Sequence, residues 1–338
     1  MVLIGRGPYD ELNEDGQSRA GQCRASPQKR RFRHVFRTSC PQLGLSSAFC
    51  SPIRQGETMH KIPTDAFDML VTLEKRPFER AGREVVVRLL DETLPDGTKL
   101  VAASDPSYPP ELAALEEHPA VLVHEGDLSL TERQLRVSIV GSRDASDSAR
   151  ADARRVAREL AARGAVVVSG LAAGIDTAAH EGALEARSPS GTVGRTIAVM
   201  GTPLSQPWPP ANARLARRIA EYGLLISLAP QVNGLSFTDE ERAESLRARN
   251  RAIAALGLGS LVMAGKEGSS TLREVAFSLE LGHPVLLWHS IVEEGEPWAI
   301  RLLENPPLDS QGRPLVQTVS SAADVEEALS PWSTVWWL

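Results

Sequence analysis

The sequence predicts an α/β fold, with a doubly wound, mainly parallel Rossmann-like sheet and a small helical N-terminal extension. Two observations predict it. From Arg136 onward, short apolar runs rich in β-branched residues alternate with amphipathic segments, the pattern of buried parallel strands joined by helices. Glycines also stand at the ends of the first two runs, Gly141 and Gly170, each before a helical segment. At such positions free backbone N–H groups can bind phosphate.

Length and patterning predict four segments in the 338 residues. Residues 1–58 are expected to be a disordered tail. Nine lysines and arginines there face five acidic residues, and a solvated tail, or sequence upstream of the true start, is favoured over a nucleic-acid arm. Globular patterning begins at Met59. Residues 59–104 are expected to form a small helical segment, residues 105–290 the Rossmann-like domain, and residues 291–338 a tail with one short helix.

Composition limits the possible classes of protein. The net charge of −6 means that a site for a polyanion must be a local basic patch. No apolar run is long enough for a membrane span, and the N-terminus lacks the apolar centre of a signal peptide. The three cysteines, Cys23, Cys40 and Cys50, fit neither a disulfide framework nor a zinc site. We therefore expect a cytoplasmic protein with no membrane partner, no metal and no cofactor.

The elements are expected in this order. The pattern of residues 63–100 predicts two short helices and a turn at 95–97. The pattern of residues 109–126 predicts a short helix followed by a strand over 120–126. In the main domain, strands are predicted at 137–140, 165–169, 196–200, 224–230, 258–265 and 284–289. Helices are predicted at 147–163, after 174, from 212 to 222, at 240–256 and up to 281. The first helix carries an apolar stripe made of Ala153, Val156, Ala157 and Leu160.

Several of these strings together resemble the DprA/Smf family of DNA-processing proteins. They are GSR at 141–143, SGLAAGID at 169–176 and RARNRAIAAL at 247–256, and the likeness covers roughly residues 105–290. The resemblance implies a homodimeric protein that binds single-stranded DNA, protects it, and loads the RecA recombinase on it during natural transformation. It implies no established catalytic activity.

The family's motifs, together with the glycine-lined strand ends, select the candidate residues for binding DNA or phosphate. Arg143 matches the basic residue of the GSR motif and is expected to stand over the carboxyl edge of the sheet. Arg249 and Arg251 flank Asn250 and cannot share one helix face, so one of them is expected to pair with a carboxylate. The full set is Gly141, Ser142, Arg143, Ser169, Gly170, Gly174, Asp176, Asn212, Arg214, Arg249, Asn250, Arg251 and Ser269.

Asp176 and His180 lie one helical turn apart and invite a metal or acid–base interpretation. A third ligand is not evident in the sequence. We therefore favour a first-turn carboxylate and a half-buried, hydrogen-bonded histidine.

Two alternatives remain open. The string GSSTLREV at 268–275 is similar to the PGGxGTxxE loop of the Lonely Guy phosphoribohydrolases. That likeness implies a nucleotide-binding enzyme or sensor, in which Glu274 and Arg251 would cleave the N-glycosidic bond of a nucleoside monophosphate through an oxocarbenium-like transition state. Lys266 and Glu267 stand where that loop has Pro-Gly. In a third interpretation, Trp332, Trp336 and Trp337 form a docking tail.

Overall fold

The computed structural model describes residues 97–338 except 117, 120, 189–190, 229–238 and 334–338. All described residues belong to one compact unit, Met59–Leu338. The expected tail at 1–58, the helices expected within 63–96, and Trp336 and Trp337 lie outside the described residues.

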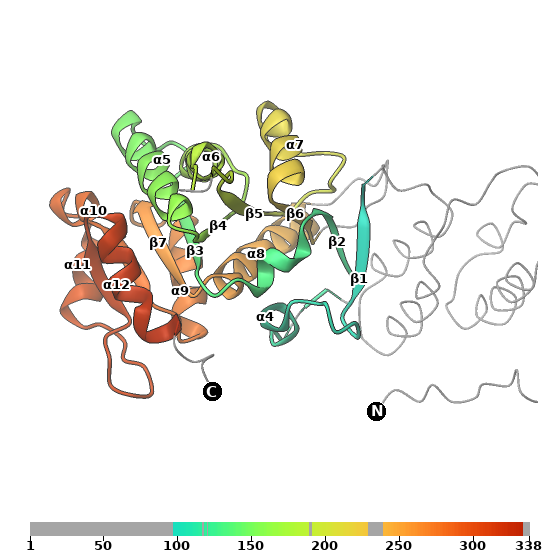
Figure 1. Cartoon of the computed structure of the whole chain (residues 1–338). Coiled ribbons are helices and arrows are strands. Elements are labelled where there is room, and N and C mark those ends of the chain that lie inside the picture. The colour runs from blue at the N-terminus through green and yellow to red at the C-terminus, as the bar shows by residue number, and fades with distance from the viewer. Residues whose placement is uncertain (1–96, 117, 120, 189–190, 229–238, 334–338) are drawn as a thin grey trace, which may run out of the picture. The chain divides into compact units, whose positions relative to one another are not determined.

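A single sheet of nine strands, in the order β1-β2-β6-β5-β4-β3-β7-β8-β9, forms the centre of the fold (Figure 1). The pairs β1/β2 and β2/β6 are antiparallel, and all other neighbours are parallel. The strands are β1 (Lys99–Ala102), β2 (Val121–Gly126), β3 (Arg136–Gly141), β4 (Val166–Ser169), β5 (Arg195–Met200), β6 (Leu224–Ser227), β7 (Gly259–Ala264), β8 (Val285–Trp288) and β9 (Val316–Val319).

Helices cover both faces of the sheet. Buried residues of α5, α6, α7 and α12 pack on one face, and those of α4, α8, α9, α10 and α11 pack on the other; Figure 1 shows α5, α6 and α7 together on one side. The helices are α4 (Pro110–Ala113), α5 (Asp147–Ala162), α6 (Ile175–Glu185), α7 (Ala213–Tyr222), α8 (Asp239–Leu256), α9 (Thr271–Glu280), α10 (His289–Glu293), α11 (Pro297–Glu304) and α12 (Ala322–Ser333), with 3-10 turns at Leu128–Glu132 and Pro210–Asn212.

The doubly wound sheet and the six strands expected in the main domain are confirmed. Four-residue β4, VVVS, is buried at every position, as a strand covered on both faces must be. Helix α5 buries the predicted stripe through Ala153, Val156, Ala157 and Leu160. Its N-cap, Ser146, accepts a hydrogen bond from the backbone N–H of Ala149 at 3.2 Å, which satisfies one free donor of the first turn.

The sheet extends further at both edges than the sequence predicts. The segment 63–100 is predicted to be helix and turn, yet Lys99–Ala102 forms the edge strand β1. Residues 291–338 are predicted to hold one short helix, yet they also contain β9, α11 and the end of α10. Both edge strands have four residues, and each exposes a polar side chain. The sequence alone does not identify so short and partly polar a run as a strand, because its conformation depends on hydrogen bonds from a neighbouring strand.

The direction of winding changes at β3. From β3 the chain proceeds through β4 and β5 to β6, then returns to add β7 on the other side of β3. In sheets of this kind ligands bind at the carboxyl ends of the strands where the order reverses. The carboxyl ends of β3 and β7 therefore mark the first place to look for a site. No helix in the described part of the chain is long and apolar enough to cross a membrane.

Candidate functional site

The loops that follow β3 and β4 are pressed together at the carboxyl edge of the sheet. Gly174, in the loop that opens α6, has φ +78°, and a Cβ built on it would lie 2.4 Å from the carbonyl oxygen of Ser142. The backbone N–H of Ile175 donates to that same carbonyl at 3.3 Å. No side chain fits at position 174, so glycine is required there by both its φ and the close approach.

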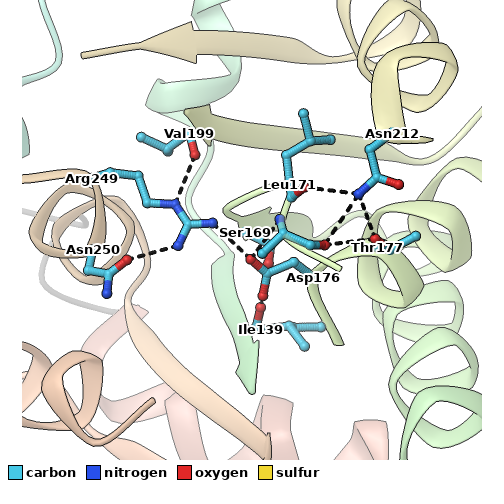
Figure 2. Close-up of polar contacts among 10 residues, drawn as sticks. Ile139, Ser169, Leu171, Asp176, Thr177, Val199, Asn212, Arg249 and Asn250 are labelled. Carbon is cyan, nitrogen blue, oxygen red and sulfur yellow. Dashed lines mark hydrogen bonds and ion pairs between the residues drawn. The ribbon is translucent and has the colours of Figure 1, made fainter. Parts of the chain in front are cut away.

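Arg249 belongs to α8, which packs on the face of the sheet opposite to α6. Its side chain reaches across the carboxyl edge toward α6. Its guanidinium donates to the Asp176 carboxylate at 2.9 Å, to the Val199 carbonyl at 3.2 Å and to the Asn250 side-chain oxygen at 2.8 Å (Figure 2). A Cβ on Gly170 would lie 1.4 Å from the guanidinium, so the arginine occupies the space that a side chain there would need. The prediction that one of the two arginines pairs with a carboxylate is confirmed for Arg249.

A second set of hydrogen bonds holds the β4–α6 loop from the other side. The buried Asn212 donates to the Leu171 carbonyl at 2.9 Å and to the Thr177 hydroxyl at 2.8 Å. Asp176 accepts from the backbone N–H of Ala172 at 3.2 Å. The Ser169 hydroxyl is fully buried and donates to the Ile139 carbonyl at 2.7 Å. These side chains support the loop that forms the site, with their polar atoms used inside the protein (Figure 2).

His180 lies beneath this network, one turn after Asp176 on α6. The sequence predicts a half-buried ring, but the ring is fully buried; the predicted hydrogen bond is present, between Nδ1 and the Thr196 hydroxyl at 2.8 Å. Burial, and then the charge of Arg249, lowers the pKa of His180 to about 3, so the ring is neutral at physiological pH. Among the described residues no group of three or more His, Cys, Asp or Glu side chains could hold a metal ion.

A small cavity of about 80 Å³ opens at the switch point, between the β3 loop, the start of α6, α8 and the start of α9. Four arginines contribute to its wall and only two carboxyl groups do. Its lining residues are Gly141, Arg143, Ala172, Asp176, Leu246, Arg247, Arg249, Asn250, Ser270, Thr271, Arg273 and Glu274. Arg143 is exposed, and within the described ranges no acceptor for its side chain is found. Its charge is therefore available to a bound anion.

Glu274 is the unusual group in this wall. It is buried, and no hydrogen-bond partner for its Oε1 is found in the part of the chain that the structure describes. Burial raises the pKa of Glu274 to about 8; the charge of Arg249 opposes this rise and that of Asp176 adds to it. The carboxyl group is therefore mostly neutral at pH 7. Because Asp176 is already paired with Arg249, the remaining arginines give the cavity a net positive charge.

The structure separates the other predicted residues. Arg251 is not in the cavity wall: its guanidinium lies 4.9 Å from the centre of the Phe277 ring. Arg249 is the arginine whose charge opposes the rise in the pKa of Glu274, whereas the alternative interpretation gave the catalytic role beside Glu274 to Arg251. Arg214 is exposed at the start of α7. Ser269, just before α9, has a buried hydroxyl.

Six lining residues lie outside the predicted set of site residues: Ala172, Leu246, Arg247, Ser270, Thr271 and Arg273. Arg247 had a detectable signal, because it precedes Asn250 by three residues on α8 and so shares its face. Thr271 had one as well, because it matches the threonine of the PGGxGTxxE loop. Arg273 had none, because only the folding of α9 against α8 brings it to the switch point.

Together, the fold and this site define a Rossmann-like protein with a cationic cavity at the switch point of its sheet. The family model described as "DNA recombination-mediator protein A" matches residues 99–300. The chain belongs to this family, which confirms the resemblance to the DprA/Smf proteins.

The chain aligns with part of the length of each individual relative. Protein Smf of Synechocystis is 34% identical over 201 residues, 59% of this chain and 48% of that protein. The DNA processing protein DprA of Bacillus subtilis is 30% identical over 198 residues, 59% of this chain and 63% of that protein. The match thus spans about half to two thirds of these relatives.

Two solved structures share the fold. The X-ray structure of DprA from Streptococcus pneumoniae is 25% identical with a TM-score of 0.53, covering 78% of this chain and 90% of that one. A structure of DprA from Helicobacter pylori, which concerns the single-stranded DNA binding mode of that protein, is 22% identical with a TM-score of 0.53. It covers 69% of this chain and 96% of that one.

Proposed function

We propose that this protein binds single-stranded DNA and that backbone phosphates enter the cationic cavity at the switch point of the sheet. The observation that carries the proposal is the wall of that cavity, in which Arg143, Arg247 and Arg273 have no counterbalancing charge once Asp176 is paired and Glu274 is neutral. Cations and small residues at helix starts are what a phosphate backbone requires. Family membership supports DNA over other polyanions.

Arg143 is the side chain on which this proposal depends most. The test is binding of the full chain to a labelled single-stranded oligonucleotide across a salt series, with Arg143→Ala beside the wild type. Affinity should fall as salt rises, because cation–phosphate contacts release counterions. Loss of one charge-assisted contact should weaken binding about tenfold or more.

The matched control is Arg133→Ala. Arg133 is also exposed but lies just before β3, at the opposite edge of the sheet, so its removal should leave the affinity unchanged. Absence of binding by the wild type at low salt would exclude the DNA function. Equal loss of oligonucleotide affinity in both variants would show that the DNA-binding site is not the cavity.

We propose further that the protein acts in the cytoplasm as a homodimer, protects incoming single strands during transformation and loads RecA on them. What supports this is the family alone. Sedimentation of the purified chain tests the dimer. Recruitment of RecA to an oligonucleotide already coated by the protein tests the loading role, and a strand that stays closed to RecA would contradict it.

A second candidate function is hydrolysis of a nucleoside monophosphate. It is favoured by Glu274, whose neutral, buried carboxyl group could protonate a leaving base beside the phosphate-binding arginines. The position of Arg251 outside the cavity wall weakens the likeness to the phosphoribohydrolases. Incubation with nucleoside monophosphates should release free base, and Glu274→Gln should stop it. No release by the wild type would exclude this candidate.

A further inference from the structure

A row of arginines follows α7 away from the cavity. Arg214, Arg217 and Arg218 lie at positions i, i+3 and i+4 and so share one face of the helix, while Leu215, Ala216 and Ile219 are buried on the other face. All three arginines are exposed. Among the described residues, none of their guanidinium groups forms an ion pair or a hydrogen bond. We call these three residues the α7 stripe.

The α7 stripe begins at the candidate site. Asn212, whose amide is bonded to Leu171 and Thr177 in the β4–α6 loop, directly precedes α7. Arg214 stands in the first turn of the helix, and Arg218 lies one turn further along, about 6 Å at 1.5 Å per residue. This length matches roughly one nucleotide of an extended single strand, so consecutive phosphates could meet consecutive arginines.

Other cations continue the positive surface beyond α7. The pKa of Glu185 is held below its usual range first by its hydrogen bond with Arg154, and also by the charges of Arg158 on α5 and Arg218 on α7. Arg158 is exposed as well. Arg154 is paired with Glu181 and Glu185, and the exposed Glu221 shares the face of Arg217 and Arg218. The α7 stripe and Arg158 still form a local excess of cations on a chain with a net charge of −6, and such a patch favours a polyanion.

An exposed aromatic residue precedes the α7 stripe. Trp208, in the loop between β5 and α7, is 64% exposed, and Pro209 and the short 3-10 turn Pro210–Asn212 separate it from the helix. Single strands are held by cations on the backbone together with aromatic rings on which bases stack. An acidic protein surface would use the arginines but would have no need for the ring.

We propose that the α7 stripe and Trp208 form a second segment of the DNA path, which receives the single strand as it leaves the cavity. This inference rests on the proposed function. It predicts a binding site longer than the cavity alone, with a base stacked on Trp208 and backbone phosphates on Arg214, Arg217 and Arg218.

The test compares two lengths of oligonucleotide on the full chain, about six and about sixteen nucleotides, within the site sizes known for single-strand binders. The double variant Arg217→Ala/Arg218→Ala should weaken binding of the long oligonucleotide about tenfold and reduce its salt slope by about 1.4, because each contact contributes about 0.7. Binding of the short oligonucleotide should not change. Trp208→Ala should weaken binding of the long one about tenfold without altering the salt slope.

The control is Lys99→Ala/Arg133→Ala, which removes the same charge from exposed positions outside the path and should affect neither length. If the α7 variants bind both lengths like the wild type while Arg143→Ala fails, the second segment is wrong and the cavity remains. If the α7 variants lose affinity equally for both lengths, the α7 stripe contributes only non-specific electrostatic attraction, and the inference is also wrong. If the wild type binds neither length, the inference and the proposed function fail together.

Discussion

The ion pair between Arg249 and Asp176 is the residue-scale feature on which the site depends. Both side chains are nearly removed from solvent, with exposed fractions of 9% and 7%. A buried pair contributes little net stability compared with apolar packing, but removal of one partner leaves an uncompensated charge. The pair therefore holds α8 and α6 together at the carboxyl edge, where the guanidinium also covers Gly170.

Asp176→Asn should destabilise the protein by about 3–5 kcal/mol, because the Arg249 charge stays buried without its carboxylate. Denaturant unfolding of the variant and the wild type measures this. The control is Asp147→Asn, which breaks the exposed pair with Arg150 and should leave the free energy of unfolding unchanged. Similar values for the two variants would contradict a structural role for the buried pair.

Glu274 should make stability depend on pH. Its pKa in the folded protein, about 8, lies above its ordinary value of 4.5, so the folded state holds the proton more tightly than the unfolded state does. The stabilisation is complete below about pH 4.5 and is lost as pH rises through about 8. Glu274→Gln should remove this decline, and its free energy of unfolding should exceed that of the wild type at pH 8 and above.

Unfolding in denaturant between pH 5 and 9 measures this difference. The same substitution should remove a second effect. Ionisation of Glu274 near pH 8 adds a negative charge to the cavity, so oligonucleotide affinity of the wild type should fall there. Parallel pH profiles of the two proteins would show that Glu274 is not the titrating group.

At the scale of elements, α5 and α6 pack closely against each other on the face of the sheet from which α6 contributes to the site. Gly182 of α6 lies against the backbone of α5, where a Cβ would lie 2.1 Å from the carbonyl oxygen of Arg154. The Arg154 side chain extends over the same contact to Glu181 and Glu185. Glycine therefore sets the distance between the helices, and polar pairs cover the seam.

Gly182→Ala should destabilise the protein by about 1–3 kcal/mol. Alanine favours a helix by about 1 kcal/mol over glycine, but the atom that it meets is backbone and cannot rotate away, so the overpacking cost prevails. Thermal unfolding measures the change. Gly201→Ala is the matched control, since its Cβ would meet its nearest neighbour, a Leu246 methyl, at 3.4 Å. A more stable Gly182→Ala variant would contradict the close contact.

At the scale of the whole molecule, the last elements complete the sheet. Strand β9 pairs with β8, and α12 buries Val325 and Leu329 in the core shared with α5. Leu329 also packs against Gly259, at the start of β7. Because β7 forms one wall of the switch point, the segment after residue 305 supports the site from a distance.

A chain that ends at Asn305 should therefore lose cooperative unfolding, because it exposes the apolar faces of β8 and α5 and leaves β8 as an unprotected edge. Circular dichroism during thermal unfolding measures this. A chain that ends at Ser333 keeps α12 and is the control. A sharp transition in the shorter chain would show that the sheet is complete without β9.

The sequence by itself determined the doubly wound sheet and the family, because both depend on local patterns. A run such as VVVS is apolar at every position, and the string SGLAAGID places glycines where a strand must turn into a helix. It also indicated that Arg249 and Arg251 point in different directions, since this follows from helical spacing alone.

Only the tertiary structure decided which arginine joins which carboxylate. Arg249 and Asp176 are 73 residues apart, and their contact exists only because α8 and α6 meet over the same edge from opposite faces. The same holds for the neutral Glu274, since a pKa depends on the surroundings and not on neighbours in sequence. The four-residue strands β1 and β9 likewise depend on partners elsewhere in the chain. Local patterns carry information about local conformation and burial, whereas the site is made of contacts between distant segments.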